Sequence, residues 1–185
     1  MTGAAGRHTI ETRTATVADA ELLADLGARA FSDTFLASTT PLDMAAYLTG
    51  AFGPDVQAAE IGDSARTFLI AEVDGETAGY AQLKRGAAPR CVVASRPIEI
   101  VRFYADAHWI GRGVGAALMQ AGLRLATDEG RDVVWLDVWE HNDRAIAFYR
   151  RWGFAPVGAA TFAIGDDVQS DLVMARYTEA ASPSR

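Results

Sequence analysis

The chain has little of the residue types that build disulfide frameworks, metal clusters and membrane spans. One cysteine, Cys91, among 185 residues excludes an internal disulfide and a cysteine-based metal site. The histidines, His8, His108 and His141, are scattered and give no metal-ligand spacing. No apolar run approaches the roughly 20 residues that span a bilayer, and residues 1–7 lack the apolar stretch of a signal peptide. We therefore expect a cytoplasmic protein with no metal and no membrane partner.

Positive charge is also scarce, which limits the partners of the chain. The sequence has 17 Lys and Arg against 24 Asp and Glu, a net charge of −7, and no basic cluster. Because nucleic acid is bound through a basic surface, we expect no nucleic-acid partner. An acidic surface instead attracts cationic small molecules, although salt screens that attraction beyond about 10 Å.

The order of the expected elements predicts a mixed α/β sheet. Hydrophobic residues make up 50% of the chain, and neither a repeat nor a Pro/Ser-rich linker interrupts it. We expect one domain over residues 8–177, between disordered tails at 1–7 and 178–185. The expected strands are 9–14, 67–73, 77–84, 98–106, 133–139, 154–163 and 168–177. The expected helices start after Thr16, at Pro41, within 54–64, after the glycines near 113 and at Asn142. In the first of these helices, Leu22, Leu23, Leu26 and Ala30 are at helical spacing.

A glycine-rich loop is the most informative segment. Ile110-Gly-Arg-Gly-Val-Gly115 joins the long strand to a helix. Glycines let the backbone turn its N–H groups towards one point, and the helix adds the free N–H groups and partial positive charge of its N-terminus. Arg112 can add a charge-assisted contact. The loop suits a pyrophosphate, but a Rossmann site is disfavoured because about a hundred residues of other elements precede it.

The next strand–helix unit adds a second motif. Asn142-Asp-Arg-Ala145, Phe148-Tyr149 and Trp152-Gly-Phe154 open and close a short helix directly after the strand at 133–139. With these motifs the chain resembles the GNAT superfamily of acyltransferases, whose Arg/Gln-x-x-Gly-x-Gly/Ala loop corresponds to Ile110 through Gly115. Ile110 departs from the usual Arg or Gln. The resemblance implies the GNAT fold, with about seven strands, about four helices and splayed central strands.

The resemblance also implies acetyl-CoA as co-substrate. The pantetheine arm enters the gap between the splayed strands, and the pyrophosphate lies on the glycine loop. Unpaired backbone at such a gap is itself a physical reason for a ligand there. The implied cofactor-binding residues are Phe103, Tyr104, Ala105, Gly111, Arg112, Gly113, Val114, Gly115, Ala116, Asn142 and Tyr149.

Two residues are candidates for proton transfer. Tyr149 matches the family's tyrosine that protonates the coenzyme A sulfur; the alternative is a core tyrosine packed against the sheet. Glu99 is the candidate base. It lies four residues before Phe103 on one strand, so the alternation of a strand predicts that both side chains share a face. Partial desolvation there would raise the pKa of Glu99 and suit it to take a proton through water; the alternative is a solvated strand-end charge.

The acceptor side resembles PaiA-type spermidine/spermine N-acetyltransferases. The similar segments are Phe31-Ser-Asp-Thr-Phe35, Tyr47-Leu48, Ala51-Phe52, residues 135–140, Gly165-Asp-Asp167 and Asp171-Leu172. We therefore expect a small-molecule amine as substrate, with spermidine or spermine favoured, and Asp33 and Glu140 as substrate-binding residues, with Glu99 and Asp137 as further negative charge.

Two other functions remain open at this point. One is an acetyltransferase for a protein N-terminus, an amino acid or a xenobiotic amine. The other is a non-catalytic acyl-CoA-binding module that keeps the glycine loop. The state of assembly is open between a monomer and a homodimer.

Overall fold

The structure is a computed structural model, and it describes residues 8–35, 39–165 and 167–178. The predicted tails at 1–7 and 178–185 lie outside the described residues, apart from Thr178. The elements in chain order are β1 (Ile10–Thr14), a 3-10 turn (Val17–Asp19), α1 (Ala20–Phe35), α2 (Pro41–Phe52), α3 (Pro54–Gly62), β2 (Arg66–Val73), β3 (Glu76–Arg85), β4 (Pro97–Ala105), a 3-10 turn (Ala107–Trp109), α4 (Val114–Asp128), β5 (Val133–Trp139), α5 (Asp143–Arg151), β6 (Ala155–Ile164) and β7 (Asp167–Tyr177).

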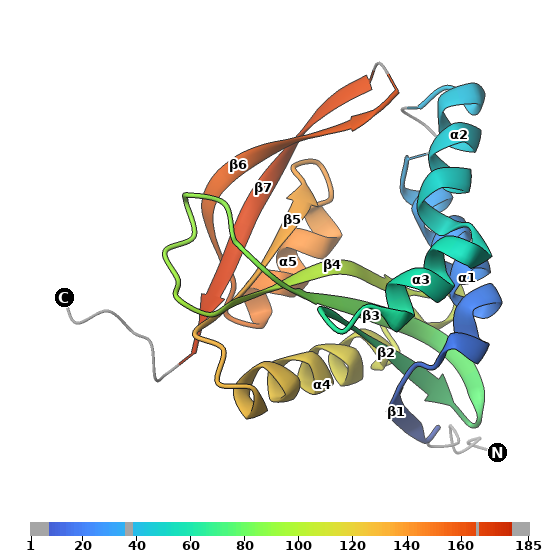
Figure 1. The fold of residues 1–185 in the computed structure, drawn as a ribbon, viewed down its shortest axis with the longest axis horizontal. Coiled ribbons are helices and arrows are strands. Elements are labelled where there is room, and N and C mark those ends of the chain that lie inside the picture. The colour runs from blue at the N-terminus through green and yellow to red at the C-terminus, as the bar shows by residue number, and fades with distance from the viewer. Residues whose placement is uncertain (1–7, 36–38, 166, 179–185) are drawn as a thin grey trace, which may run out of the picture.

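The strands form one mixed sheet, as the sequence predicts. Their order is β1-β2-β3-β4-β5-β7-β6, and every neighbouring pair is antiparallel except β4–β5, which is parallel. The β2–β3 turn is the expected Asp74-Gly75 hairpin, with φ of 51° and 87° at the two residues. The β6–β7 hairpin rises on one side of the molecule and α2 on the other, and β5 ends between them (Figure 1).

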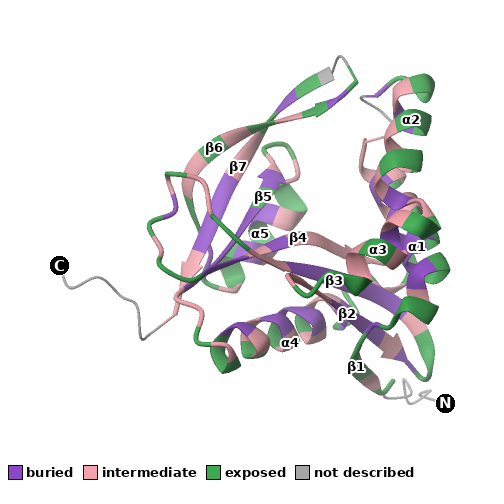
Figure 2. Ribbon diagram, viewed as in Figure 1, coloured by how far each residue is buried: buried purple, intermediate pink, exposed green. Residues whose placement is uncertain are grey.

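Helices cover both faces of the sheet and divide the core. The face under α4 and α5 buries the larger apolar cluster, which includes Leu83, Ile98, Leu118, Leu136 and Met174. On the opposite face, α1 packs on Phe68, Ile70 and Tyr80, while α1, α2 and the end of β6 enclose Phe31, Met44, Phe52 and Ile164. The central strands are accordingly mostly buried, while the outer surfaces of α1 and α2 are exposed (Figure 2).

The first turns of two helices follow their sequence signals. The Thr40 hydroxyl accepts a hydrogen bond from the Asp43 N–H at 3.2 Å, and Pro41 takes the first helical position. In α1, Leu23 and Leu26 are buried, but Leu22 is 41% exposed. Of the apolar residues at helical spacing in the sequence, Leu23 and Leu26 thus belong to the buried stripe of α1, which continues through Phe31, and Leu22 does not.

The two parallel strands diverge after a short pairing. Only residues Pro97–Glu99 of β4 pair with Val133–Trp135 of β5. Beyond Glu99, β4 remains paired with β3, whereas β5 remains paired with β7 along its whole length. The backbone edges that β4 and β5 turn towards each other therefore have no strand partner over the second half of each strand. The predicted splay of the central strands is present.

A β-bulge in β4 sets which side chains reach each face. Gln82 pairs with Arg102 but Leu83 pairs with Ile100, so Val101 is an extra residue. The bulge reverses the alternation of side chains along β4. Glu99 therefore shares the α1–α3 face with Arg102, while Phe103 lies on the α4–α5 face, in the cluster with Ile98. The prediction that Glu99 and Phe103 share a face was wrong, because strict alternation fails at Val101.

We expect the same substitution to have opposite effects in two helices. A Cβ on Gly27 of α1 would lie 2.5 Å from the Tyr80 hydroxyl and 2.6 Å from Phe52, whereas a Cβ on Gly50 of α2 would meet nothing within 4 Å. Gly27→Ala should lower the free energy of unfolding by about 1–3 kcal/mol through overpacking. Gly50→Ala should raise it by about 0.5–1 kcal/mol, because alanine favours the helix.

Urea denaturation of the two variants, with unchanged slopes of the transitions, measures these free energies. A Gly27→Ala protein as stable as the Gly50→Ala protein would contradict the close packing of α1 on Tyr80 and Phe52.

Candidate active site

The glycine loop turns the backbone towards the start of α4. Gly111 and Gly113 have φ of 77° and 97°, a region that favours glycine. Gly113 is the N-cap of α4, and a glycine has no side chain to cap the N–H groups of the first helical turn. These N–H groups and the helix dipole are therefore available to an anionic ligand.

The glycine loop faces the cleft mainly with its backbone and less with its side chains. Gly111, Gly113, Gly115 and Ala116 line a cleft, whereas Val114 is fully buried in the core under the sheet. The Arg112 guanidinium lies 5.6 Å from the centre of the Trp109 ring and is not among the side chains that line the cleft. A direct contact of Arg112 with a phosphate stays a prediction.

The cleft runs through the gap between β4 and β5. It has a volume of about 1480 Å³. One end holds the glycine loop, the middle is lined by Phe103, Tyr104, Ala105 and Tyr149, and the other end is lined by the carboxylates Glu99, Asp137 and Asp171. Residues from both faces of the sheet thus meet in one continuous space, because the strands diverge there.

Tyr149 lies in the cleft on the α4–α5 face. It is 8% exposed, and its ring packs against Phe103 (centroids 6.1 Å apart) and Phe154 (5.8 Å). Burial raises the pKa of the Tyr149 phenol well above its usual value, so the phenol keeps its proton at neutral pH. Tyr149 is therefore both a core residue and a residue that lines the cleft, and its role as a proton donor stays a prediction.

Asn142 begins the helix that carries Tyr149. Its Oδ1 accepts a hydrogen bond from the Ala145 N–H at 3.1 Å, the expected N-cap interaction. Because Asn142 also lines the cleft, the cap and a contact with a bound cofactor are compatible. The cofactor contact stays a prediction.

Glu99 reaches the cleft from the opposite face to Tyr149. Its half-buried side chain lies at the last paired position of β4, level with Trp135 of β5. Burial raises the pKa of the Glu99 carboxyl, Lys84 opposes that shift, and the charge of Asp137 adds to it. A carboxylate with a raised pKa at the vertex of the splay is suited to accept a proton.

The two predicted substrate-binding carboxylates are placed differently. Asp33, near the end of α1, lines the cleft. Glu140 is not among the lining residues; its exposed side chain lies after β5, 3.8 Å from Nε2 of His141. Asp171 of β7 also lines the cleft, although the sequence analysis did not predict it as a substrate-binding residue. Its position follows from pairing with Trp139 of β5, which the sequence does not give.

Comparison with known proteins identifies the family. The profile of the acetyltransferase (GNAT) family matches residues 30–154, more than half of the chain. The chain belongs to the GNAT family. It is 34% identical over 144 residues to an uncharacterized N-acetyltransferase of Lactobacillus delbrueckii, covering 78% of this chain and 83% of that one. An uncharacterized N-acetyltransferase of Mycobacterium tuberculosis is 34% identical over 158 residues, 85% of this chain and 97% of that one.

A solved structure has the same fold. The PaiA N-acetyltransferase of Thermoplasma acidophilum in complex with coenzyme A superposes with a TM-score of 0.75 over 92% of this chain and 99% of that chain, at 20% identity. As a GNAT N-acetyltransferase, this chain uses acetyl-CoA. The site fits that co-substrate: an uncapped helix N-terminus at one end and unpaired strand backbone in the middle suit a pyrophosphate and an amide-bearing arm.

Two other classes of site receive no support. In the described ranges 8–35, 39–165 and 167–178, no group of three or more His, Cys, Asp or Glu side chains is placed to hold a metal ion. Within these same ranges no helix is both long and apolar enough to cross a membrane.

We expect Gly113→Glu to abolish stabilisation by acetyl-CoA. The substitution puts a side chain and a negative charge at the N-cap of α4, where the pyrophosphate is expected. At a concentration a hundredfold above its Kd, a ligand stabilises a protein by about 2.7 kcal/mol, which a thermal unfolding scan detects.

The matched control is Gly130→Glu at the other end of α4. Gly130 also has a positive φ, of 62°, so this variant carries similar backbone strain and the same added charge. It should lower the Tm of the free protein and retain the shift with acetyl-CoA. An equal shift in both variants would contradict the assigned pyrophosphate site.

Proposed function

We propose that this GNAT enzyme acetylates a polyamine, such as spermidine or spermine, with Tyr149 as the acid and Glu99 as the base. The observation that carries the proposal is the placement of these two groups on opposite faces of one gap. Tyr149 lies with the α4–α5 cluster, on the side of the glycine loop, and Glu99 lies on the face of α1–α3. Acetyl-CoA and the amine can then approach the gap from opposite sides.

The two groups can carry the protons of a direct transfer. The neutral amine nitrogen attacks the carbonyl carbon of the thioester, a C–N bond forms and the C–S bond breaks. The Tyr149 phenol donates its proton to the departing sulfur. The nitrogen loses its extra proton to Glu99, directly or through a water molecule. Unpaired N–H groups on the edge of β4 beyond Glu99 are candidates to stabilise the oxygen of the carbonyl as negative charge develops.

A cationic acceptor is supported by the charge of the acceptor side. The carboxylates Asp33, Glu99, Asp137 and Asp171 line the cleft, and the whole chain has a net charge of −7. Four arginines line the cleft as well, and two of them are paired with acidic side chains: Arg29 with Asp25 and Arg102 with Glu60. Several carboxylates in one cleft favour an acceptor with more than one positive charge. Acetyl-CoA is a cytoplasmic metabolite, so we place the reaction in the cytoplasm. We expect the enzyme to act as a monomer or as a homodimer.

Two alternatives make different demands on the same site. An acetyltransferase for a protein N-terminus, an amino acid or a xenobiotic amine needs one reacting nitrogen and does not need several carboxylates in the cleft. A non-catalytic acyl-CoA-binding module needs neither Tyr149 nor Glu99. An acetyl-transfer assay against a panel of amines, read by mass spectrometry, separates these possibilities from the polyamine enzyme.

Substitution of the two proton-transfer groups should have separable effects. Tyr149→Phe should lower kcat by roughly ten- to a thousandfold, with little change in acetyl-CoA affinity, because only the proton for the leaving thiolate is lost. Glu99→Gln should depress kcat/KM most at pH values just above the raised pKa of Glu99, where the wild-type carboxylate is ionised but few amines are already neutral. In the wild type, the base works only while ionised, so kcat/KM should fall as the pH drops through the raised pKa of Glu99.

Tyr177→Phe and Glu76→Gln, outside the cleft, are the matched controls and should keep wild-type rates. If Tyr149→Phe and Glu99→Gln also keep them, the two residues are structural.

The proposal also predicts a contrast in salt dependence between substrates. Each exposed pairing of an ammonium with a carboxylate contributes only about 0.2–1 kcal/mol, but several of them add selectivity for a polyamine. Because salt screens these pairings, KM for spermidine should rise steeply with ionic strength, while KM for a short monoamine should move much less. Steady-state kinetics from low to high salt measures the contrast. Much more efficient acetylation of a neutral amine than of spermidine would refute the polyamine proposal and leave the acetyltransferase intact.

A further inference from the structure

Three neighbouring strands each present a carboxylate to the acceptor face. Glu99 of β4 lies level with Trp135 of β5, and Asp171 of β7 lies level with Trp139 of β5; Asp137 stands between these two levels on β5 itself. Same-face positions along a strand are roughly 7 Å apart. The carboxylates therefore form a ladder whose first step, Glu99, lies at the vertex of the splay and whose last step, Asp171, lies farthest from it.

Among the described residues, Asp171 forms no ion pair with a side chain of opposite charge. Its Oδ1 is buried, and among the residues that the structure describes it has no hydrogen-bond partner. Burial raises the pKa of Asp171 to about 6, and the negative charges of Asp137 and Glu140 add to that shift. A buried acceptor surrounded by like charges lacks compensation, and a bound cation would supply it.

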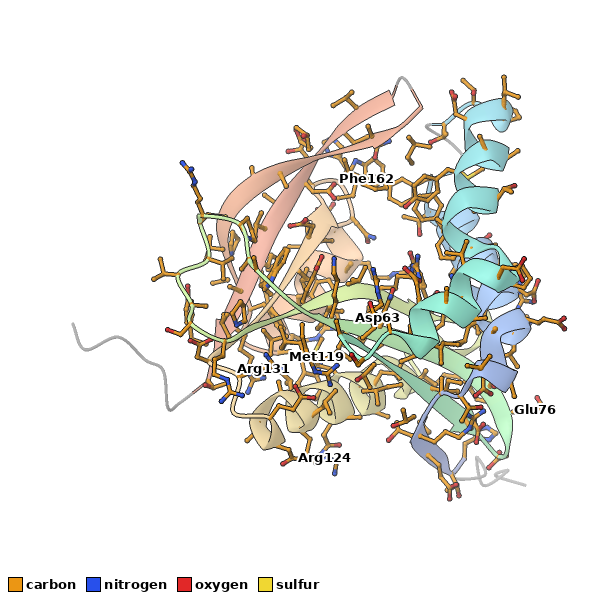
Figure 3. All side chains as sticks on the ribbon, viewed as in Figure 1. Asp63, Glu76, Met119, Arg124, Arg131 and Phe162 are labelled. Atoms are coloured by element: carbon orange, nitrogen blue, oxygen red, sulfur yellow. The ribbon has the colours of Figure 1, made fainter. Side chains whose placement is uncertain are left out.

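Aromatic rings enclose the same end of the cleft. Phe31 and Tyr47 stack with their centroids 4.5 Å apart, Phe162 meets Tyr47 edge-on at 5.7 Å, and Trp139 lies 5.6 Å from Phe35. These five rings, which we call the aromatic compartment, come from α1, α2, β5 and β6. Phe162 lies in the space between the β6–β7 hairpin and α2 (Figure 3). Aromatic faces attract ammonium groups and also cover methylene chains.

We propose that Asp171, with Asp137, binds the second, non-reacting ammonium group of a diamine or polyamine within the aromatic compartment. This role deepens the proposed function and rests on it. The reacting nitrogen lies at the gap beside Glu99, the methylene spacer passes along the rings, and the second nitrogen reaches the last step of the ladder. Asp171 is then a specificity-determining residue that distinguishes a diamine from a monoamine of equal length, and it takes no part in proton transfer.

The test compares two substrates that differ in one ammonium group. Wild-type protein and Asp171→Asn are assayed at pH 8, where Asp171 is ionised, with 1,10-diaminodecane, whose chain is long enough to span the two ladder steps from Glu99 to Asp171, and with n-decylamine. Asp171→Asn should raise KM for the diamine about tenfold or more, because its second charge loses a desolvated carboxylate. KM for the monoamine and for acetyl-CoA should stay within about twofold, and kcat should change little, because the chemistry at the gap is untouched.

Two further variants make the test specific. Asp171→Glu retains the charge and should restore part of the preference for the diamine. Asp128→Asn changes the net charge equally at an exposed site at the end of α4, and should leave the ratio of the two KM values as in the wild type. Thermal unfolding with and without acetyl-CoA shows whether each variant is folded and binds its co-substrate.

The outcomes separate this role from the proposed function. An unchanged ratio of KM values in Asp171→Asn, with the diamine still acetylated, overturns the role of Asp171 and leaves the polyamine enzyme standing. Acetylation of the monoamine alone by the wild type overturns the polyamine acceptor and this role with it. A change in the ratio that Asp128→Asn reproduces overturns the local role in favour of a general effect of net charge.

Discussion

The separation of β4 from β5 is the constraint on which the site depends. Two parallel strands pair over only three residues each and then diverge, although each remains fully paired on its other side. A hydrogen bond contributes about 0.5–1.5 kcal/mol net, and a buried backbone group without a partner costs about 1–3 kcal/mol. Strands that diverge therefore leave a place where an amide-bearing ligand is stabilised, and they open a passage from one face of the sheet to the other.

The bulge at Val101 gives that passage two chemically different sides. Without an extra residue, Glu99 and Phe103 would lie on one face, and a carboxylate would be buried among the rings that surround Tyr149. The bulge moves Glu99 to the face of Asp137 and Asp171 and keeps Phe103 in the apolar cluster under the sheet. The group suited to donate a proton and the group suited to accept one are thus separated by the sheet, and each lies in surroundings that suit its charge.

The sequence was informative where function depends on local chemistry. The glycines at 111 and 113, the Asn142 cap and the Asp74-Gly75 hairpin each require particular residue types, and the strand and helix bounds follow them closely. What could not be predicted depends on pairing between distant segments. No local sequence pattern predicts the bulge at Val101, because the bulge arises from the register of β4 against Gln82 and Leu83 of β3. For the same reason Asp171 had no assigned role, since its place beside Trp139 depends on how β7 pairs with β5.

The carboxylates of the acceptor face are better explained by binding than by stability. Elsewhere in the described residues, acidic side chains are tied to arginines: Glu129 to Arg85 and Arg131, Glu60 to Arg66 and Arg102, Asp19 to Arg13. Such pairing lowers the pKa of Glu129 and Asp19. Glu99 and Asp171 show the reverse, with pKa values raised by burial and by neighbouring carboxylates. Burial of Glu99 and Asp171 costs stability, which Lys84 and Arg66 offset in part for Glu99 and which no cation offsets for Asp171 among the described residues. In the proposed function, these carboxylates form a preformed site for which the acceptor supplies the positive charge.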